Sequence, residues 1–521
     1  MAPLTRRHFL ALLGASGGSA AVAGALSGWG MLPASAAAEP PRLEGSGDGR
    51  RILILGAGLA GMTAAIELTA LGYDCTILEA RDRAGGRVFT MRGGTTLSQL
   101  GHPDSVVPYD EGQWFNPGPW RIPHSHESTL HYCRRFSVPL EVFINDNENG
   151  WVATKDGERI RLHTLRTDLR GNVAELLAKS AGDLDSDLDD GDTERLTEFL
   201  RNEMGLGSKE LAYTGTDARG YKTFPGAGSR SGVVGDPLSL SNVLDWAGDV
   251  PGAALLSLPS RYFQQPMFHP VGGMDRISAA FEAQLPERIL FRHEVRSVRQ
   301  DAVGVRVIAR DLGTGADREI TADYAIATIP TSVLNQIEGD WSRETRRAFA
   351  DIPYFPVGKL GFQMADRFWE TDEQIFGGHS FTNAEMGTIT YPSDEYLSPK
   401  GILQGFYIFG GQASQISALS QEERSQRAVA SASSIHSDFG DHVKSAASFF
   451  WHLERYSLGG WAEHTRESRE GAYTHLLEPD GRVYFAGEHL SHLPAWMAGA
   501  IESAWFTMER LHERAQQENQ Q

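Results

Sequence analysis

The segment from residue 52 to residue 87 constrains this chain more than any other. Ile52–Leu55 is an apolar run typical of a buried strand, and it leads into residues 56–61 with the spacing G-x-G-x-x-G. In such a motif Gly56 permits a tight turn, Gly58 lets the backbone approach a pyrophosphate, and Gly61 lets the next helix lie close to the strand. The helix N-terminus then offers free N–H groups and a partial positive charge to the phosphates.

The residues after these glycines complete a nucleotide-binding pattern. A second apolar strand ends at Glu79, 18 residues after Gly61. An acid about 20 residues after the glycines accepts hydrogen bonds from a ribose diol. A glycine turn without a ligand is the alternative, because the chain has 57 glycines. The strand, turn and helix context favours an adenine dinucleotide. The apolar residues at helical spacing are Ala60, Ala64, Leu68 and Leu71.

Length and charge limit the class of protein. A chain of 521 residues predicts two or three domains. The net charge of -19, without a basic stripe, argues against a nucleic-acid partner. The acidic run 183–194 is interpreted as a solvated loop, with a cation site as the alternative, because it lacks the glycine and terminal acid of a calcium loop. There is no HExxH, CxxC or nucleophilic triad, and the 17 histidines show no metal spacing, so no metal site is expected.

Residues 1–38 are predicted to be a targeting signal. Thr5 to Leu10 contain the pair Arg6 and Arg7, and small-residue cleavage sites occur at 34–36 and 36–38. The segment is similar to a twin-arginine signal, which exports folded proteins to the periplasm or the outside of the cell. An uncleaved anchor is the alternative, although many Gly, Ala and Ser residues make 10–32 a poor transmembrane helix. No other segment reaches about 18 apolar residues, so no stable membrane insertion is expected after cleavage.

Several segments together carry a family resemblance. Arg81, Gly85, Gly86 and Arg87 follow the acid, and Tyr-Phe-Ala-Gly-Glu-His ends at residue 489 before Ala-Trp-Met-Ala-Gly-Ala at 495–500. These segments resemble the second and third flavin-binding segments of the flavin amine oxidase superfamily. The similarity runs from about residue 50 to residue 515 and is close to bacterial secreted L-amino-acid oxidases.

The resemblance implies an α/β fold, α+β overall, with a Rossmann-like FAD-binding domain of the amine oxidase type. A mixed-sheet substrate domain and a helical insert accompany it. The expected divisions are the twin-arginine signal peptide (1–38), FAD-binding segment 1 (50–120), a mainly helical insert (121–245), FAD-binding segment 2 (268–330), the substrate-binding domain (331–450) and FAD-binding segment 3 (451–521).

The implied cofactor is FAD. Only Cys75 and Cys133 occur, which excludes a disulfide framework, and neither lies in the C-terminal flavin segment, so FAD is expected to be held noncovalently. In the family Arg87 meets the pyrophosphate, Glu488 binds the ribityl and pyrophosphate region, and the Val295 backbone reaches the adenine. The implied cofactor-binding residues are Gly56, Gly58, Leu59, Ala60, Gly61, Glu79, Ala80, Arg81, Gly86, Arg87, Gly118, Pro119, Trp120, Arg121, Val295, Gly487, Glu488, Trp496, Met497 and Ala498.

The loop 115–123 (Phe-Asn-Pro-Gly-Pro-Trp-Arg-Ile-Pro) indicates the substrate class. Arg121 occupies the position that projects an arginine at the substrate carboxylate in L-amino-acid oxidases, and a guanidinium binds a carboxylate bidentately. An arginine at the surface or in a structural salt bridge is the alternative. Tyr407 matches the second carboxylate ligand, and Phe406 would point to the opposite face of a strand.

Three further residues complete the implied site. Lys359 matches the catalytic lysine that holds a water near the flavin, with snorkelling to solvent as the alternative. Trp496 would pack beside the flavin ring and, with Ala495, beside the substrate; a core tryptophan is the alternative reading.

The implied function is FAD-dependent oxidative deamination of L-amino acids to 2-oxo acids, with oxygen consumed and ammonia and hydrogen peroxide released. The aromatic candidates Trp246, Phe409, Trp451 and Trp461 favour a hydrophobic or aromatic substrate side chain. The same fold also serves decarboxylating amino-acid 2-monooxygenases and amine oxidases, which remain open, as do a membrane-tethered dehydrogenase and a noncatalytic flavoprotein. A homodimer is one option for the oligomeric state.

Overall fold

A five-stranded parallel sheet collects strands from three distant parts of the chain. The computed structural model describes residues 39–180, 189–207, 211–250, 255 and 261–519. The strand order is β14-β2-β1-β18-β25, and every neighbouring pair is parallel. The expected α/β class is confirmed. The strands are β1 (Arg51–Leu55), β2 (Asp74–Leu78), β14 (Ile289–Leu290), β18 (Tyr324–Ala327) and β25 (Val483–Phe485).

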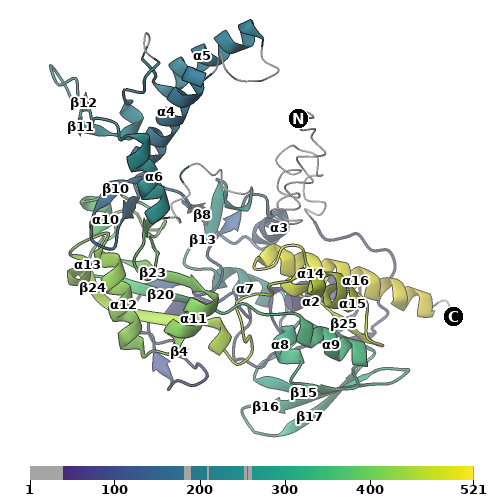
Figure 1. Ribbon diagram of the computed structural model, residues 1–521. Coiled ribbons are helices and arrows are strands. Elements are labelled where there is room, and N and C mark those ends of the chain that lie inside the picture. Colours follow the sequence, from purple (N-terminus) through teal and green to yellow (C-terminus); the bar gives the residue numbers. More distant parts are fainter. Residues whose placement is uncertain (1–38, 181–188, 208–210, 251–254, 256–260, 520–521) are drawn as a thin grey trace.

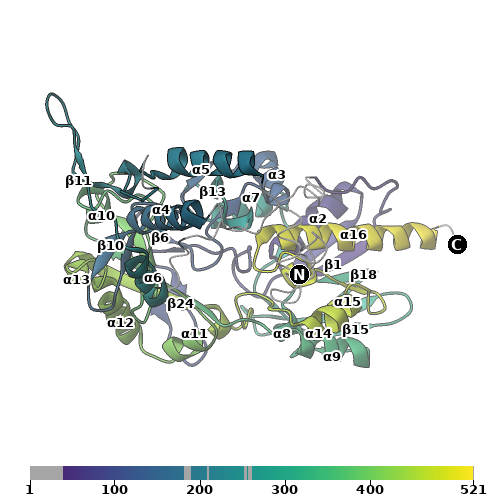
Figure 2. The same cartoon turned by 45° about the horizontal axis from the view of Figure 1, so that its top comes forward.

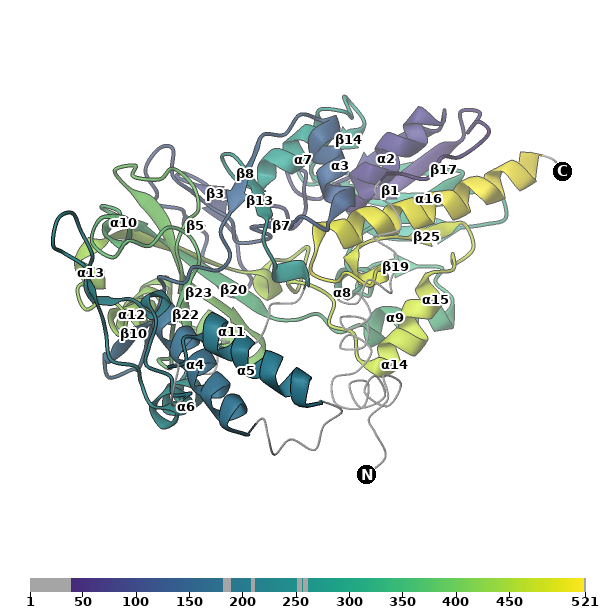
Figure 3. The same cartoon turned by 90° about the horizontal axis from the view of Figure 1, so that it is seen from above.

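Both faces of this sheet are buried. In β1, Ile52 and Ile54 belong to one apolar core, whereas Leu53 and Leu55 belong to another, because successive side chains of a strand point to opposite faces. Cys75 is buried in β2. The first core includes residues of four helices, of which α2 and α16 lie side by side (Figure 1, Figure 3). These helices are α2 (Leu59–Ala70), α3 (Glu127–Arg135), α7 (Asp275–Glu282) and α16 (Met497–Asn519).

The second core lies between the parallel sheet and a four-stranded sheet of order β17-β16-β15-β19. The apolar residues of 290–298 and 303–309 predict two strands, and the structure places β15 and β16 there. The sequence did not reveal β17, because its residues are polar and mostly exposed. The strands are β15 (His293–Gln300), β16 (Val305–Asp311), β17 (Asp317–Ala322) and β19 (Glu338–Gly339).

A seven-stranded mixed sheet forms the other half of the molecule (Figure 2). Its order is β10-β9-β21-β22-β23-β20-β24, and the β9–β21 pair is the parallel one. One face packs on helices α11, α12 and α13. The strands are β9 (Trp151–Ala153), β10 (Arg159–Arg161), β20 (Val357–Met364), β21 (His379–Thr382), β22 (Thr388–Thr390), β23 (Gly401–Phe409) and β24 (Val443–Phe450). The helices are α11 (Gly410–Ser417), α12 (Gln421–Ser433) and α13 (Phe439–His442).

The range 121–245, expected to be mainly helical, combines helices with short strands. Its strands β9 and β10 join the mixed sheet, and its helices α4 and α5 project from the body as an arm with the β11-β12 hairpin (Figure 1). At the base of the arm, buried Asp168 accepts from Arg219 Nε at 2.8 Å. The helices are α3 (Glu127–Arg135), α4 (Leu162–Ser180), α5 (Asp190–Met204) and α6 (Leu240–Asp249), and the hairpin strands are β11 (Tyr221–Thr223) and β12 (Val233–Val234).

A small sheet of order β7-β13-β8 lies between the two halves and positions the segments that contain Arg121 and Asn145. Arg121 immediately precedes β7, and Asn145 follows β8 by two residues. The strands are β7 (Ile122–Pro123), β8 (Leu140–Phe143) and β13 (Met267–Pro270). The remaining short elements are β3 (Met91–Arg92), β4 (Thr96–Leu97), β5 (Ser105–Val106), β6 (Trp114–Phe115), α8 (Thr331–Leu334), α9 (Arg343–Asp351), α10 (Phe368–Thr371), α14 (Arg466–Ser468) and α15 (Thr474–Leu476).

Two sequence predictions concern residues outside this description. The predicted targeting signal, residues 1–38, lies outside the described residues, and the acidic run 183–194 falls partly in the gap at 181–188. Within the run, Asp189 caps α5 by accepting from the Asp192 N–H. Among the described helices, none is long and apolar enough to cross a membrane.

Candidate active site

One cavity of about 850 Å³ lies at the carboxyl ends of the parallel strands. Its lining includes Gly56 after β1, Glu79 after β2, Thr328 after β18 and Gly487 after β25. Open α/β sheets bind ligands at this edge, where the loops that follow the strands diverge. The cavity extends from Val295 at one end to Arg121 and Trp496 at the other, so it crosses from the parallel sheet to the mixed sheet.

The glycine turn fits a phosphate group. Gly56 has φ +108°, which glycine adopts readily, and Thr328 closes the turn by donating to the Leu55 and Gly56 carbonyls at 2.9 and 3.1 Å. A Cβ placed on Gly58 would meet nothing within 4 Å, so the space above this backbone is open. Helix α2 begins at Leu59 without a side-chain cap, and its first N–H groups remain available for an anion.

Gly61 has a packing role instead. It does not line the cavity, and a Cβ there would lie 2.1 Å from the Gly56 carbonyl oxygen. Helix α2 therefore approaches β1 this closely because residue 61 is glycine.

Glu79 is buried beside this turn and braces it. Its carboxylate accepts from the Ala57 and Arg81 backbone N–H groups, each at 2.9 Å. A carboxylate has about four acceptor positions, so capacity remains for a ribose diol. The structure thus adds a structural role for Glu79 to the expected role in ribose binding.

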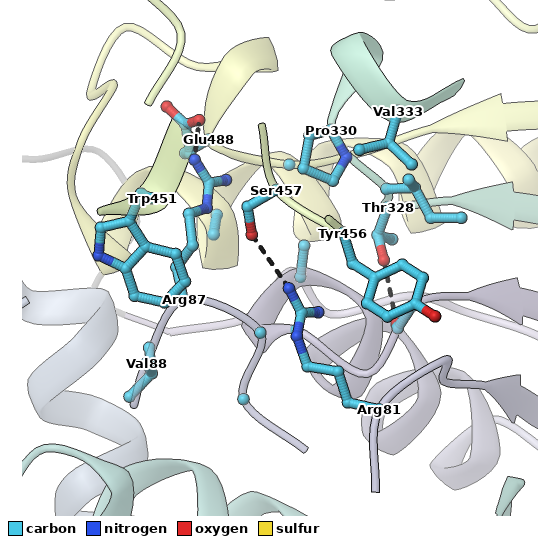
Figure 4. A pocket seen from close by; sticks show the side chains of 18 of the residues that line it. Arg81, Arg87, Val88, Thr328, Pro330, Val333, Trp451, Tyr456, Ser457 and Glu488 are labelled. Atoms are coloured by element: carbon cyan, nitrogen blue, oxygen red, sulfur yellow. Dashed lines mark hydrogen bonds and ion pairs between the residues drawn. The ribbon is translucent and has the colours of Figure 1, made fainter. Parts of the chain in front are cut away.

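Two arginines of FAD-binding segment 1 (50–120) point into the cavity (Figure 4). Arg81 pairs with Glu454 and donates to the Ser457 hydroxyl at 3.0 Å. Arg87 pairs with Glu488 at 2.8 Å, across 401 residues of sequence. Burial lowers the pKa of Arg87, but the charge of Glu488, the nearby Tyr354 and the hydrogen bond to Glu488 together outweigh this effect, and the net pKa is raised.

Glu488 connects three segments of the chain through its carboxylate. Besides Arg87, its carboxylate accepts from the backbone N–H groups of Ala462 at 3.2 Å and Ala495 at 3.1 Å. The residue is buried, at 5% exposure. The pyrophosphate arginine and the ribityl acid implied by the sequence therefore form one ion pair, which fixes the C-terminal segment against the first flavin-binding segment.

Arg121 lines the cavity as a partly buried cation without an acidic partner among the described residues. Its guanidinium packs between the rings of Trp120 and Phe263, with its central carbon 5.1 and 4.8 Å from their centroids. Among the described residues it forms no ion pair, and its Nε has no hydrogen-bond partner. Burial lowers its pKa to about 10, and Tyr407 partly offsets this. No structural salt bridge therefore accounts for Arg121 in the described part of the chain.

Tyr407 lies beside Arg121 on the cavity face of β23. It lines the cavity, whereas neighbouring Phe406 is fully buried in the core under α11 and α12. Burial raises the pKa of Tyr407 to about 12, so its hydroxyl remains protonated and can donate a hydrogen bond.

Lys359 lies directly across from Tyr407 on β20, on the same face of the sheet. It is 1% exposed and therefore does not snorkel to solvent. Its Nζ donates to the Gly118 carbonyl at 2.6 Å and lies 4.5 Å from the Trp120 ring centroid. Burial, and then the charge of Arg121, place its pKa well below the usual value. Lys359 does not line the cavity but supports the loop that does.

That loop is also held by contacts with distant residues. A Cβ on Gly118 would lie 2.1 Å from the Arg87 carbonyl oxygen, so this close approach requires glycine. The indole of Trp451 donates to the Pro117 carbonyl at 2.9 Å.

Aromatic side chains form the walls around Arg121. Trp496 packs on Phe263 and, edge-on, on buried His126 at a centroid distance of 4.7 Å. Phe409 and Trp461 line the cavity, and their ring centroids are 5.7 Å apart. Trp246, expected as a candidate wall, packs instead against a core of the helical insert, because its helix α6 lies away from the cavity.

The cavity gathers most of the site residues that the sequence singled out. Gly61, Lys359 and Ala498 are the ones that do not line it; Ala498 is fully buried in α16. Sequence reasoning missed lining residues such as Phe263, Thr328, Arg455 and Ser457, which follow no motif or spacing. It also missed Asn145, which accepts from Arg121 Nη1 at 2.7 Å.

Comparison with known proteins agrees with this geometry. The family model for flavin containing amine oxidoreductase matches residues 59–511. The chain is 30% identical to the Bacillus subtilis (strain 168) protein YobN, provisionally named an L-amino-acid oxidase, over 88% of this chain and 94% of that protein. It is 26% identical to an L-amino-acid oxidase of Echis ocellatus, over 88% of both chains.

Solved structures show the same fold at low sequence identity. Cyclohexylamine oxidase from Brevibacterium oxydans IH-35A has a TM-score of 0.58 at 15% identity, covering 91% of this chain and all of that one. Wild-type putrescine oxidase bound to putrescine has a TM-score of 0.56 at 17% identity, covering 89% and 98%. The matched family model covers most of the chain and, from helix α2 onward, the elements that line the cavity, so this protein belongs to the flavin-containing amine oxidoreductase family.

Proposed function

We propose that this protein is an FAD-dependent L-amino-acid oxidase. The observation that carries the proposal is Arg121, a partly buried guanidinium with a buried Nε that lines the cavity without a carboxylate partner among the described residues. Withdrawing a cation from water without an anionic partner is costly, so its retention is explained by a ligand that brings the negative charge. The names of the relatives support the same reading.

The cavity supports FAD as the cofactor. The open space above Gly58, the uncapped start of α2 and the Arg87 side chain suit a pyrophosphate. We propose noncovalent binding, because both cysteines of the chain, Cys75 and Cys133, are buried outside the cavity lining. Bound FAD would supply the two-electron oxidation at Cα and pass the electrons to oxygen.

The chain's own residues would bind and orient the amino acid. Arg121 and the Tyr407 hydroxyl hold the carboxylate, which fixes the position of Cα relative to the cofactor. Phe263, Phe409 and Trp461 form an apolar wall that suits a hydrophobic or aromatic side chain and excludes water. Lys359 supports the loop under the substrate through Gly118; its proposed role in holding a water near the flavin stays a prediction. The products are the 2-oxo acid, ammonia and hydrogen peroxide.

The purified protein tests this proposal directly. Acid precipitation should release FAD into the supernatant, and an L-amino acid should bleach the flavin absorbance without oxygen, whereas its D-enantiomer should not. In air, the 2-oxo acid, ammonia and peroxide should form in equal amounts. An amide with carbon dioxide would identify a monooxygenase, and turnover of amines alone would identify an amine oxidase.

We also propose export by the twin-arginine route, on the sequence of residues 1–38. Replacing both Arg6 and Arg7 with lysine should leave the unprocessed protein, with FAD loaded, in the cytoplasm of a host that has this pathway. Unchanged export of the double variant would refute the assignment.

A further inference from the structure

The guanidinium of Arg121 is oriented by one neutral side chain. Nη1 of Arg121 donates to Oδ1 of Asn145 at 2.7 Å, and this is the side-chain hydrogen bond that the described structure gives Arg121. Asn145 follows strand β8, which pairs with β13, and Arg121 precedes β7, which pairs with the same strand. The small three-stranded sheet therefore holds the two segments together.

An amide at position 145 has a particular electrostatic consequence. An amide oxygen orients the guanidinium but carries no net charge, so the positive charge of Arg121 stays available for a ligand. A carboxylate of nearly the same shape would form an ion pair with Arg121 and neutralise it inside the protein. The substrate carboxylate would then have to compete with that internal partner.

The next residue shows that a carboxylate in this segment is directed elsewhere. Asp146 accepts from Arg166 Nη1 at 2.8 Å, and its side chain is 43% exposed. Arg166 also pairs with Glu148 at 2.9 Å. Within this segment the neutral Asn145 accepts from Arg121, whereas the charged Asp146 and Glu148 accept from Arg166.

We propose that Asn145 is a positioning residue that orients Arg121 while leaving its charge unpaired, and that its neutrality determines the preference for carboxylated amines over plain amines. This inference rests on the proposed function, because it assumes that Arg121 binds the substrate carboxylate.

The test compares three variants of the FAD-loaded enzyme. N145D introduces the carboxylate at nearly constant shape, N145A removes the hydrogen bond without adding charge, and D146N changes the charge by one unit at the adjacent position. Each is assayed with the best L-amino acid and with the amine formed by its decarboxylation. Benzoate, a carboxylate without an amino group, is titrated against the flavin absorbance to measure carboxylate affinity without turnover.

The order of the effects identifies the role of Asn145. We expect N145D to weaken benzoate binding and to raise the KM for the amino acid by at least about tenfold, more than N145A does, because the added charge competes with the ligand. The kcat/KM ratio of amine to amino acid should rise in N145D, and D146N should behave like the parent.

Three results would overturn the inference: equal losses in N145D and N145A, unchanged benzoate affinity in N145D, or the same change in D146N. Failure of the proposed function is visible separately, because the parent enzyme itself would then not oxidise L-amino acids, and the inference would fall with it. A misfolded variant is recognised by loss of bound FAD, and N145S then supplies the uncharged comparison with an acceptor retained.

Discussion

Replacing Arg121 with methionine tests the carboxylate-binding hypothesis in two opposite directions. Methionine keeps the length and apolar character of the side chain but removes the guanidinium. In the free enzyme this partly buried cation packs against aromatic rings without an anion among the described residues, and the loss of hydration already lowers its pKa to about 10. Its removal should therefore not destabilise the substrate-free, FAD-loaded enzyme, and the thermal midpoint should stay the same or rise.

The same change should severely impair amino-acid turnover. A charge-assisted hydrogen bond contributes about 1.5–3 kcal/mol, so losing a bidentate pair costs about 3–4 kcal/mol net of the desolvation that binding requires. That range corresponds to a fall in kcat/KM of about 10²- to 10³-fold. The decarboxylated amine makes no carboxylate contact, so its turnover should stay constant or improve.

Peroxide release, measured over a range of amino-acid and amine concentrations, gives both values of kcat/KM. Arg424 is a matched control, because it is a buried arginine away from the cavity whose pKa burial also lowers to about 10. Arg424→Met should lower the thermal midpoint, since Arg424 donates to the Ile416 carbonyl and the Ser448 hydroxyl, but it should preserve the substrate preference. The reasoning is refuted if Arg121→Met leaves kcat/KM for the amino acid unchanged or reduces both substrates equally.

Three further predictions follow from the same structure. Glu488→Gln removes the anion that pairs with partly buried Arg87, so the FAD-free protein should lose about 1.5–3 kcal/mol of stability and the FAD-loaded protein less, because the pyrophosphate restores an anion. Equal losses in thermal or urea unfolding of the two forms would contradict this. Gly61→Ala places a Cβ 2.1 Å from the Gly56 carbonyl oxygen, so the affinity for FAD should fall at least about tenfold. Titration of the FAD-free protein with FAD measures this affinity. The control Gly248→Ala, in open space on α6, should leave the affinity unchanged. Burial lowers the pKa of four histidines to about 4 or about 3. Below about pH 6.5 the unfolded state therefore binds more protons at these histidines than the folded state does. Their contribution to the stability of the folded protein should be complete above that pH and should fall as the pH drops toward 4. The thermal midpoint measured against pH should show this loss, with a shallower dependence in His269→Gln; a midpoint independent of pH between 4.5 and 6.5 would be incompatible with these neutral histidines. The four residues are His126, His269, His379 and His489.

Local features of the sequence determined the nucleotide-binding half of this protein. The turn at Gly56, the close contact at Gly61 and the apolar strands on both sides depend on neighbouring residues and on the steric limits of the backbone, so they can be recognised as a motif. The return of the chain to the parallel sheet at β25 was predictable for the same reason, because a short apolar strand precedes Gly487 and Glu488.

The tertiary structure decided how the distant segments act on one another. Only the folded chain pairs Arg87 with Glu488, buries Lys359 under the cavity loop instead of exposing it to the ligand, and sets the neutral Asn145 against Arg121. No periodicity or spacing encodes these contacts, because they depend on where the β7-β13-β8 sheet and the long β20–β23 pair place side chains in space. The sequence thus identified the groups that can bind a cofactor and a carboxylate, and packing determined which of their charges are neutralised within the protein and which remain for a ligand.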